Sequence, residues 1–310
     1  MTAPPAAKRA RAPALDIAVS TLEVPGLGVP WGLLVLADGT RLVGTEQNTL
    51  QLLTPAGQLA LIAGEDEEEG FEDGKGANAR FRDPCGMTVD SAGHIVVADR
   101  GNHALRRVSK AGEVSTLAGN GEEGFEDGQG DAARFNGPDG VALAANDEIV
   151  VADSGNHAIR VVTPGGAVRT LAGNGEAGFA DGQGAAARFN CPQGLARDKD
   201  GSILVADTGN HAVRRVTMDG AVSTVAGNGE AGYADGEGAA ARFYGPTDVV
   251  VDKEGTIVVA DYDNERLRKI VGRQVTTLAG GSEAGTADGA GRARAPARGR
   301  VRPGAHAAGG

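Results

Sequence analysis

The 310-residue chain has little cysteine, few aromatic residues and no long hydrophobic run. Its two cysteines, Cys85 and Cys191, are too few for a disulfide framework, so a reducing, intracellular compartment is expected. No apolar stretch approaches the ~18 residues of a membrane span, and residues 1–13 contain no apolar core of a secretion signal. No stretch has a sustained helical period. These absences argue against membrane, secreted disulfide-rich and helical proteins, and they favour the cytoplasm, with the nucleus or an organelle as alternatives.

Glycine, in contrast, is abundant, and charge is unevenly distributed. The 50 glycines are roughly twice the usual share, and they follow no three-residue period, so they predict many turns rather than collagen. Residues 1–13 and 292–310 carry three and five Lys or Arg and no acid, and both ends are expected to be disordered. Residues 14–291 then hold 22 Lys or Arg against 41 Asp or Glu. Such an acidic body repels nucleic acid and anionic membranes.

One segment of the form Val-Ala-Asp-x-Gly-Asn-His recurs every 54 residues. It occupies residues 97–103, 151–157 and 205–211, and a changed form occupies 259–265. The same spacing places Asn48 in a first copy. A series of prolines keeps this period: Pro30, Pro84, Pro138, Pro192 and Pro246. The sequence therefore contains five copies of one supersecondary unit.

Each copy predicts four short strands. In the third copy these are residues 140–144, 148–152, 157–162 and 167–171, which are rich in Val, Ile and Leu and separated by Gly, Asn, Asp and Pro. Four-stranded units repeated around a ring make a β-propeller, which disposes of sheet edges by closing on itself. The predicted fold class is therefore all-β, a propeller of four-stranded antiparallel blades within residues 14–291.

The number of blades depends on one additional strand. Residues 19–22 repeat the form of the outermost strand, yet no inner strands precede them. Propellers commonly complete one blade from both chain ends, so this strand favours a six-bladed ring with an incomplete last blade; a five-bladed ring is the alternative. After Gly291 the repeat stops and an Arg-, Ala- and Gly-rich segment follows. The expectation is that this chain is a truncated or misread form of a longer one.

The residues Asp153, Asn156, His157, Ile159 and Arg160 resemble the NHL repeat, a propeller-blade motif named for its Asn, His and Leu positions. The resemblance covers about residues 19–291, and it departs where Thr49 and Glu265 replace the histidine. It implies an interaction surface rather than a catalyst. A structural role is expected for the signature positions, which are Asp99, Asn102, His103, Asp153, Asn156, His157, Asp207, Asn210, His211, Asp261 and Asn264.

Long Gly-rich loops join the repeats, and they contain all seven phenylalanines. These rings are expected to fill the seams between blades. Strand direction places the loops and the Asp-x-Gly-Asn-His turns at the same end of the propeller, here called the loop face, where a ligand is expected. The candidate partner-binding residues on these loops are Glu67, Glu68, Glu122, Glu123, Glu176 and Glu230.

Catalytic and metal chemistry find little support in the sequence. His103, His157 and His211 recur at one repeat position, which would hold them apart rather than around one ion, so a bond to the neighbouring turn's Asp is expected. The repeated Asp-Gly pairs are read as turns capped by their own carboxylates. No nucleophile motif is present. The prediction is therefore no catalytic residue, no metal and no cofactor.

The sequence favours a non-enzymatic, monomeric scaffold that binds a basic protein or peptide through its acidic loop face. The alternative is a hydrolase or lyase, similar to propeller lactonases or amidating lyases, with a metal at the central axis. Residues lining the axis discriminate between the two. Acids or histidines that differ between blades would favour the enzyme, and repeated small or apolar residues would favour the scaffold.

Overall fold

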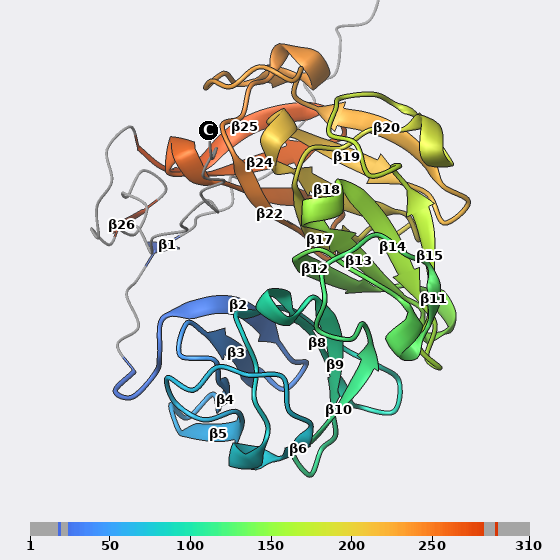
Figure 1. Ribbon diagram of the computed structural model, residues 1–310. Helices are drawn as coiled ribbons and strands as arrows, with labels where there is room; N and C mark the ends of the chain where they lie inside the picture. Colours follow the sequence, from blue (N-terminus) through green and yellow to red (C-terminus); the bar gives the residue numbers. More distant parts are fainter. Residues whose placement is uncertain (1–17, 20–23, 282–288, 291–310) are drawn as a thin grey trace, which may run out of the picture.

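Short apolar strands punctuated by turn residues build five antiparallel blades in a ring (Figure 1). The structure, a computed structural model, describes residues 18–19, 24–281 and 289–290. Blade 1 comprises β2 (Pro30–Val35), β3 (Arg41–Thr45), β4 (Leu50–Leu53) and β5 (Leu59–Ala63). Blade 2 comprises β7 (Pro84–Val89), β8 (Ile95–Asp99), β9 (Ala104–Val108) and β10 (Glu113–Ala118). Blade 3 comprises β12 (Pro138–Leu143), β13 (Ile149–Asp153), β14 (Ala158–Val162) and β15 (Ala167–Ala172). Blade 4 comprises β17 (Pro192–Arg197), β18 (Ile203–Asp207), β19 (Ala212–Val216) and β20 (Ala221–Ala226). Blade 5 comprises β22 (Pro246–Val251), β23 (Ile257–Asp261), β24 (Arg266–Val271) and β25 (Gln274–Gly280).

The predicted four-stranded propeller is confirmed, with a short fifth strand added to four of the blades. This strand comes from the loop before each blade and pairs antiparallel with the outermost strand. The added strands are β6 (Gly74–Lys75), β11 (Gly128–Gln129), β16 (Gly182–Gln183) and β21 (Gly236–Glu237). Each is followed by one of the short 3-10 turns η1 (Gly76–Asn78), η3 (Gly130–Ala132), η6 (Gly184–Ala186) and η8 (Gly238–Ala240). The long loops are therefore held against the blade that follows them.

The extra N-terminal strand pairs with the C-terminal end of the repeat region. β1 (Ala18–Val19) is antiparallel to β26 (Gly289–Ala290), with Val19 opposite Gly289. A valine opposite a glycine is also the pairing of Val168 with Gly128 in blade 3. The described residues contain five blades, which is the count of the five-bladed alternative. The inner strands of a sixth blade and both predicted disordered ends lie outside the described residues.

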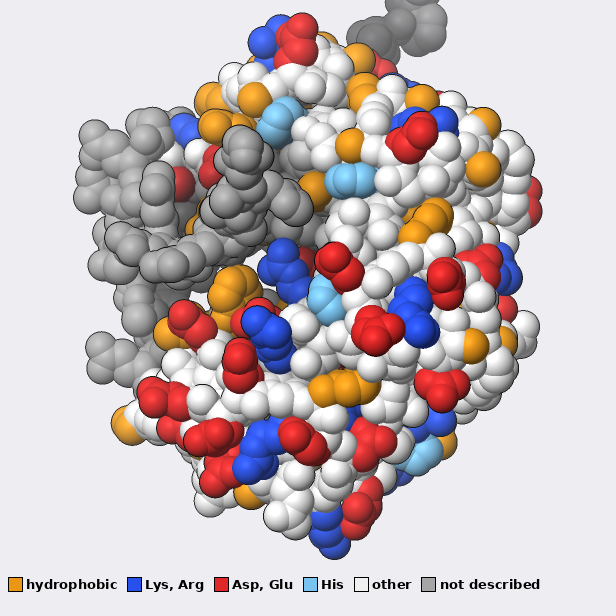
Figure 2. All heavy atoms as spheres, viewed as in Figure 1, with side chains coloured by type: hydrophobic (Ala, Val, Ile, Leu, Met, Phe, Trp, Pro, Cys, Tyr) orange, Lys and Arg blue, Asp and Glu red, His pale blue; other side chains and the backbone are white. Residues whose placement is uncertain are grey.

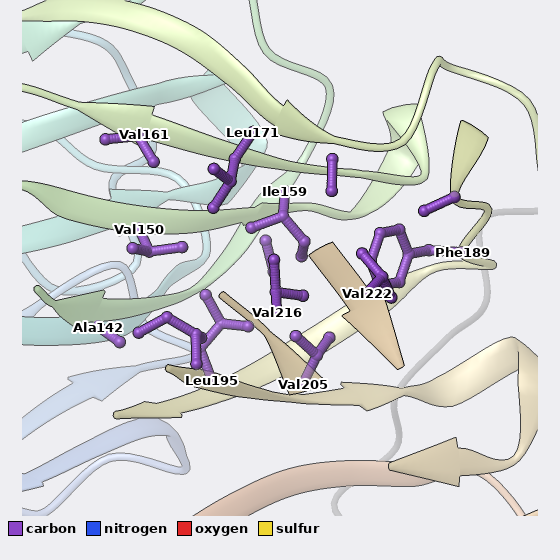
Figure 3. Packing of buried hydrophobic residues seen from close by; sticks show 14 of the residues in the cluster. Ala142, Val150, Ile159, Val161, Leu171, Phe189, Leu195, Val205, Val216 and Val222 are labelled. Atoms are coloured by element: carbon purple, nitrogen blue, oxygen red, sulfur yellow. The ribbon is translucent and has the colours of Figure 1, made fainter. Parts of the chain in front are cut away.

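Aliphatic side chains of neighbouring blades interdigitate to form the core. Between blades 3 and 4, Val150, Ile159 and Leu171 from one sheet meet Leu195 and Val205 from the next (Figure 3). Comparable clusters fill the seams between blades 1 and 2, 2 and 3, and 4 and 5. Burial of apolar surface contributes about 25 cal/mol per Å², so these seams supply the main stabilisation of the ring.

Close approach of the innermost strands explains one repeated glycine. The strands β2, β7, β12, β17 and β22 pack against one another in chain order. A Cβ at Gly140 would lie 2.3 Å from the Gln193 carbonyl oxygen, and one at Gly86 would lie 2.2 Å from the Asp139 carbonyl oxygen. Real Cβ atoms do not approach backbone oxygens so closely, so only glycine lets adjacent blades meet here.

Two blade faces have no covering blade in the described part of the chain. Leu33 in blade 1 is 62% exposed, whereas its counterpart Met87 in blade 2 is 8% exposed. Leu267 in blade 5 is 39% exposed, whereas Val213 in blade 4 is fully buried. The loss of burial at the two ends of the blade series shows that each seam requires a blade on both sides.

The described residues include no helix with the length and apolar character needed to cross a bilayer.

Candidate functional site

A buried arginine on the third strand of a blade ties the loop face together. In blade 3, Arg160 Nη1 donates to Asp153 Oδ2 at 2.7 Å and to the Arg134 carbonyl at 3.1 Å. Its Nη2 donates to Asp127 Oδ1 at 2.7 Å and to the Glu126 carbonyl at 2.8 Å. Arg160 is completely buried. Charge-assisted bonds of this length are among the strongest in proteins, so they fix the long loop to the blade that it precedes.

Two aromatic rings enclose the guanidinium. The Cζ atom of Arg160 lies 4.9 Å from the centre of the Phe125 ring and 5.2 Å from that of Phe135. These distances are within the roughly 6 Å range of cation–π attraction. Phe135 is fully buried, as expected for a seam residue, but Phe125 is 37% exposed. Half of the loop aromatics therefore act as partly exposed covers over arginines rather than as seam fillers.

We call this arrangement the arginine clamp, and it occurs in blades 2 to 5. Each copy has an arginine, the signature aspartate, an Asp-Gly aspartate and two rings. The copies are Arg106 with Asp99, Asp73, Phe71 and Phe81; Arg160 with Asp153, Asp127, Phe125 and Phe135; Arg214 with Asp207, Asp181, Phe179 and Phe189; and Arg268 with Asp261, Asp235, Tyr233 and Phe243. Sequence reasoning named Arg160 in the repeat motif but gave the arginine no role, although its recurrence at 54-residue spacing was a usable signal.

The Asp-Gly aspartate does not cap its own turn, contrary to the sequence prediction. Asp127 receives bonds from Arg160 and from the backbone N–H and hydroxyl of Thr170 on the outermost strand. Partial burial alone would raise the pKa of Asp127, but these bonds outweigh it and the pKa is lowered. In contrast, burial raises the pKa of Asp153 to about 6, against the opposing effect of Arg160. The two carboxylates of one clamp therefore differ in pKa: that of the partly exposed Asp127 is lowered, and that of the buried Asp153 is raised.

The signature asparagine connects the clamp to the loop backbone. Asn156 Nδ2 donates to Asp153 Oδ2 at 2.8 Å and to the Gly124 carbonyl at 2.7 Å. Asp153 Oδ1 also accepts the Asn136 backbone N–H at 2.8 Å. The remaining signature asparagines make the same two bonds, and they are Asn102, Asn210 and Asn264. The structure thus places the signature aspartates and asparagines inside the attachment of the loop to the blade.

The signature histidine joins one blade to the next, but through a different partner from the one predicted. His103 Nδ1 accepts the Gly137 backbone N–H at 3.0 Å, and His157 Nδ1 accepts the Cys191 N–H at the same distance. Neither bond involves the neighbouring aspartate. In blade 1, Asn48 Oδ1 accepts the Asp83 N–H at 3.0 Å, so Asn48 occupies the histidine position and not the asparagine position. The turn in blade 1 is one residue shorter, which sequence spacing alone did not reveal.

Burial lowers the pKa of His103, His157 and His211 below the ordinary value. An acceptor Nδ1 requires a ring that is not protonated there, so the lowered pKa and the hydrogen bond favour the same neutral form. Each imidazole therefore acts as a neutral acceptor between blades at ordinary pH.

The predicted partner-binding glutamates are all exposed on the loop face. Three of them form ion pairs within their own loops: Glu122 lies 3.5 Å from Arg134, and Glu176 lies 3.5 Å from Arg188. The third, Glu230, lies 2.8 Å from Arg242. The glutamate side chains of these pairs are 65–75% exposed, and such surface pairs contribute only about 0–1 kcal/mol. The carboxylates therefore remain accessible. Asp and Glu side chains gather over blades 1 and 2, in the lower part of the view of Figure 2, with Lys and Arg between them.

Residues 81–107, 135–162, 189–215 and 243–270 match the family model described as NHL repeat. The match covers the ring phenylalanine, the inner strands and the signature turn of blades 2 to 5. The chain is an NHL-repeat β-propeller.

Relatives of this NHL propeller are considerably longer. Protein SUPPRESSOR OF QUENCHING 1, chloroplastic, of Arabidopsis thaliana is 30% identical over 73% of the chain. NHL repeat-containing protein 2 of Bos taurus is 34% identical over 53% of the chain. The aligned parts make up 23% and 24% of those proteins, so the NHL propeller spans about a quarter of their length.

Solved structures share the propeller fold at low identity. An auxiliary nutrient binding protein from Bacteroides ovatus has a TM-score of 0.60 at 21% identity, covering 81% of this chain and 60% of that one. A gluconolactonase from Xanthomonas campestris has a TM-score of 0.56 at 16% identity, covering 81% and 76%. Virginiamycin B lyase from Staphylococcus aureus has a TM-score of 0.52 at 14% identity, covering 83% and 72%. At these identities the likeness concerns the fold alone.

The innermost strands of the NHL propeller differ in sequence beside their shared proline. The residue after each innermost proline is different in every blade: Trp31, Cys85, Asp139, Gln193 and Thr247. Asp139 Oδ2 lies 3.8 Å from Arg100 Nε, and burial raises the pKa of Asp139 against the opposing effect of Arg100. At the position of Arg100, blade 4 has Thr208, whose hydroxyl donates to the Pro246 carbonyl at 2.7 Å.

Metal and thiol chemistry gain no site among the described residues. No group of three or more His, Cys, Asp or Glu side chains in that part of the chain is arranged to hold a metal ion. Both cysteines are free; burial raises the pKa of the Cys85 thiol and of the Cys191 thiol. Because the thiolate is the reactive form, burial makes both groups poor nucleophiles.

Proposed function

We propose that this NHL propeller is a non-enzymatic binding module that takes a basic protein or peptide on its loop face. One observation carries the proposal: each long loop presents an accessible carboxylate beside a partly exposed aromatic ring. Phe125, Phe179 and Tyr233 are 37%, 41% and 48% exposed. Glu122, Glu176 and Glu230 stand three residues before these rings in the same loops. Aromatic faces and carboxylates together suit the stems and charged ends of Lys and Arg side chains.

The clamps support this proposal by making the loops rigid. Each exposed ring rests on a buried guanidinium, so its position is set before a partner arrives. Binding then loses little loop entropy, which favours affinity. The net negative charge of residues 14–291 further attracts a basic partner and disfavours nucleic acid. We propose that the module acts as a monomer in an intracellular compartment, in keeping with its two free cysteines.

Fluorescence anisotropy with two labelled octapeptides tests this function. The probes are an alternating Arg-Ala peptide and an alternating Glu-Ala peptide, measured at low and moderate salt. We expect the basic peptide alone to bind, with an affinity that falls as salt rises. The variant E176K/E230K should weaken binding about tenfold, which is about 1.4 kcal/mol. Absence of binding by the basic peptide, or preference for the acidic one, overturns the proposal.

The matched control is E113K/E254K. Glu113 and Glu254 are 58% and 65% exposed, and they lie at the end of the propeller opposite the loop face. The control changes net charge by the same amount as E176K/E230K. Equal weakening by both variants would show a general charge effect and would contradict binding at the loop face.

A second candidate function rests on the axis. Asp139 has no acidic counterpart after the proline of any other blade, and such non-repeated acids favour a hydrolase or lyase. A panel of lactones and cyclic esters, with and without added divalent cations, tests this candidate. Turnover that D139N abolishes while leaving the fold intact would favour the enzyme, and absence of turnover across the panel would count against it.

A further inference from the structure

Blade 1 lacks the arginine clamp, although its strands keep the register of the other blades. Val43 pairs with Gln51, as Val97 pairs with Arg106 in blade 2, so Gln51 occupies the arginine position. Two further positions of the clamp, and the threonine that bonds its Asp-Gly aspartate, also change between blades 2 and 1. Asp99 corresponds to Thr45, Phe81 to Leu27, and Thr116 to Leu61. Among the described residues, blade 1 therefore has neither the guanidinium nor the counterparts of the signature aspartate and of the buried ring Phe81.

These replacements leave a pocket in place of the clamp. Its volume is about 470 Å³, within the roughly 300–1,000 Å³ of small-ligand pockets. Leu27, Gln51 and Leu61, which replace the ring, the arginine and the threonine, all line it. Asp66 and Glu67 from the following loop also line it. We call this pocket the blade 1 niche.

The niche contains an unsatisfied acceptor. Gln51 Oε1 is buried and has no hydrogen-bond partner among the residues that the structure describes. A buried acceptor without a donor costs about 1–3 kcal/mol, so a ligand that donates a hydrogen bond to Gln51 Oε1 would recover that free energy. The lining also includes two acidic side chains, Asp66 and Glu67, and two apolar ones, Leu27 and Leu61. The niche thus offers acceptors and apolar surface together.

Glu67 holds a backbone conformation that is unusual for its residue type. Its φ is +61°, whereas the positive-φ residues in the matching stretch of the next loops are Gly121, Gly175 and Gly229. Non-glycine residues with positive φ are uncommon and strained, and they concentrate at functional sites. The loop after blade 1 therefore has a glutamate in a backbone conformation for which the other loops use glycine.

We propose that the blade 1 niche binds an arginine side chain of the basic partner, in the place that the chain's own arginines occupy in blades 2 to 5. This inference rests on the proposed function and specifies its anchoring contact. The guanidinium donates to Gln51 Oε1 and to the carboxylates of Asp66 and Glu67, and its stem packs on Leu27 and Leu61. Arginine is preferred over lysine because a planar fork reaches several acceptors at once.

The test compares two identical substitutions in blade 1. Gln51→Arg places the chain's own guanidinium in the niche, and Gln58→Arg makes the same change at an exposed turn at the opposite end. We expect Gln51→Arg to weaken the Arg-Ala octapeptide at least about tenfold and Gln58→Arg less than about twofold. Glu67→Gly, which relieves the positive φ, should weaken it about fivefold without loss of thermal stability. A Lys-Ala octapeptide should bind more weakly than the Arg-Ala peptide.

A second probe separates failure of the niche from failure of the proposed function. Methylguanidinium is titrated while the Gln51 side-chain amide is followed by NMR. Unchanged peptide binding in Gln51→Arg, with the variant folded by circular dichroism, overturns the niche and leaves the proposed function standing. A methylguanidinium shift at Gln51 without any peptide binding supports the niche and overturns the proposed function. Absence of both signals overturns both.

Discussion

Replacing Arg160 by glutamine, the residue that blade 1 has at this position, should be strongly destabilising. Arg160 is completely buried and makes four hydrogen bonds, two of them to carboxylates at 2.7 Å. Its loss leaves Asp153 buried without its charge partner and removes the guanidinium between Phe125 and Phe135. Removal of one partner from a buried ion pair costs about 3–5 kcal/mol, so the free energy of unfolding should fall by that amount.

The paired change in blade 3 provides the decisive comparison. Blade 1 is folded with Thr45 and Gln51 in place of the aspartate and the arginine, so D153T/R160Q copies an arrangement that the chain already uses. The double variant should be less destabilised than the sum of the two single variants by about 1–3 kcal/mol. Urea unfolding followed by circular dichroism measures all four proteins. A change of less than about 1 kcal/mol in R160Q, or strict additivity of the two changes, would refute the reasoning.

Two further predictions concern the seams. Replacing His103, His157 and His211 together by asparagine keeps the acceptor that Asn48 provides in blade 1 and removes the titration. Because burial lowers the imidazole pKa values, the stabilisation by the neutral rings is present above pH 6.5 and is lost as the pH falls through the pKa of the folded state. Over that range the wild type should lose roughly 0.5–1 kcal/mol of unfolding free energy for each histidine, and the asparagine variant should not. Equal pH profiles of the two proteins in urea melts would contradict this. Gly140→Ala should cost about 1–3 kcal/mol, since its Cβ would lie 2.3 Å from the Gln193 carbonyl. The control Gly165→Ala has its nearest atom at 4.0 Å and should leave the melting temperature unchanged.

Repetition made most of the fold readable from the sequence. A period of 54 residues located the blades, and alternating apolar runs located their strands, because each blade must bury the same face against its neighbour. The two-residue strand of the long loop was missed because Gly128 and Gln129 have no strand propensity of their own. It exists because the clamp holds the loop against the outermost strand. Tertiary contacts, rather than local preference, decide that element.

The candidate site was readable only in part. Exposure of Glu122 and its place on the loop face followed from strand direction, but its pairing with Arg134 requires the folded loop. Asn48 was aligned with the signature asparagines, whereas hydrogen bonding assigns it to the histidine position. The niche at Gln51 could not be found from blade 1 alone. Its meaning depends on strand register, which shows that the same place holds a guanidinium in the other blades.

Hydrogen–deuterium exchange with the Arg-Ala octapeptide bound tests the central claim most directly, because it reports which end of the propeller the peptide covers. The account predicts protection of residues 64–70 beside the blade 1 niche and of the matching loops 119–124, 173–178 and 227–232. Turns at the opposite end, residues 109–112 and 163–166, should exchange at the rate of the free protein. Protection of those turns with none in the long loops would contradict binding at the loop face.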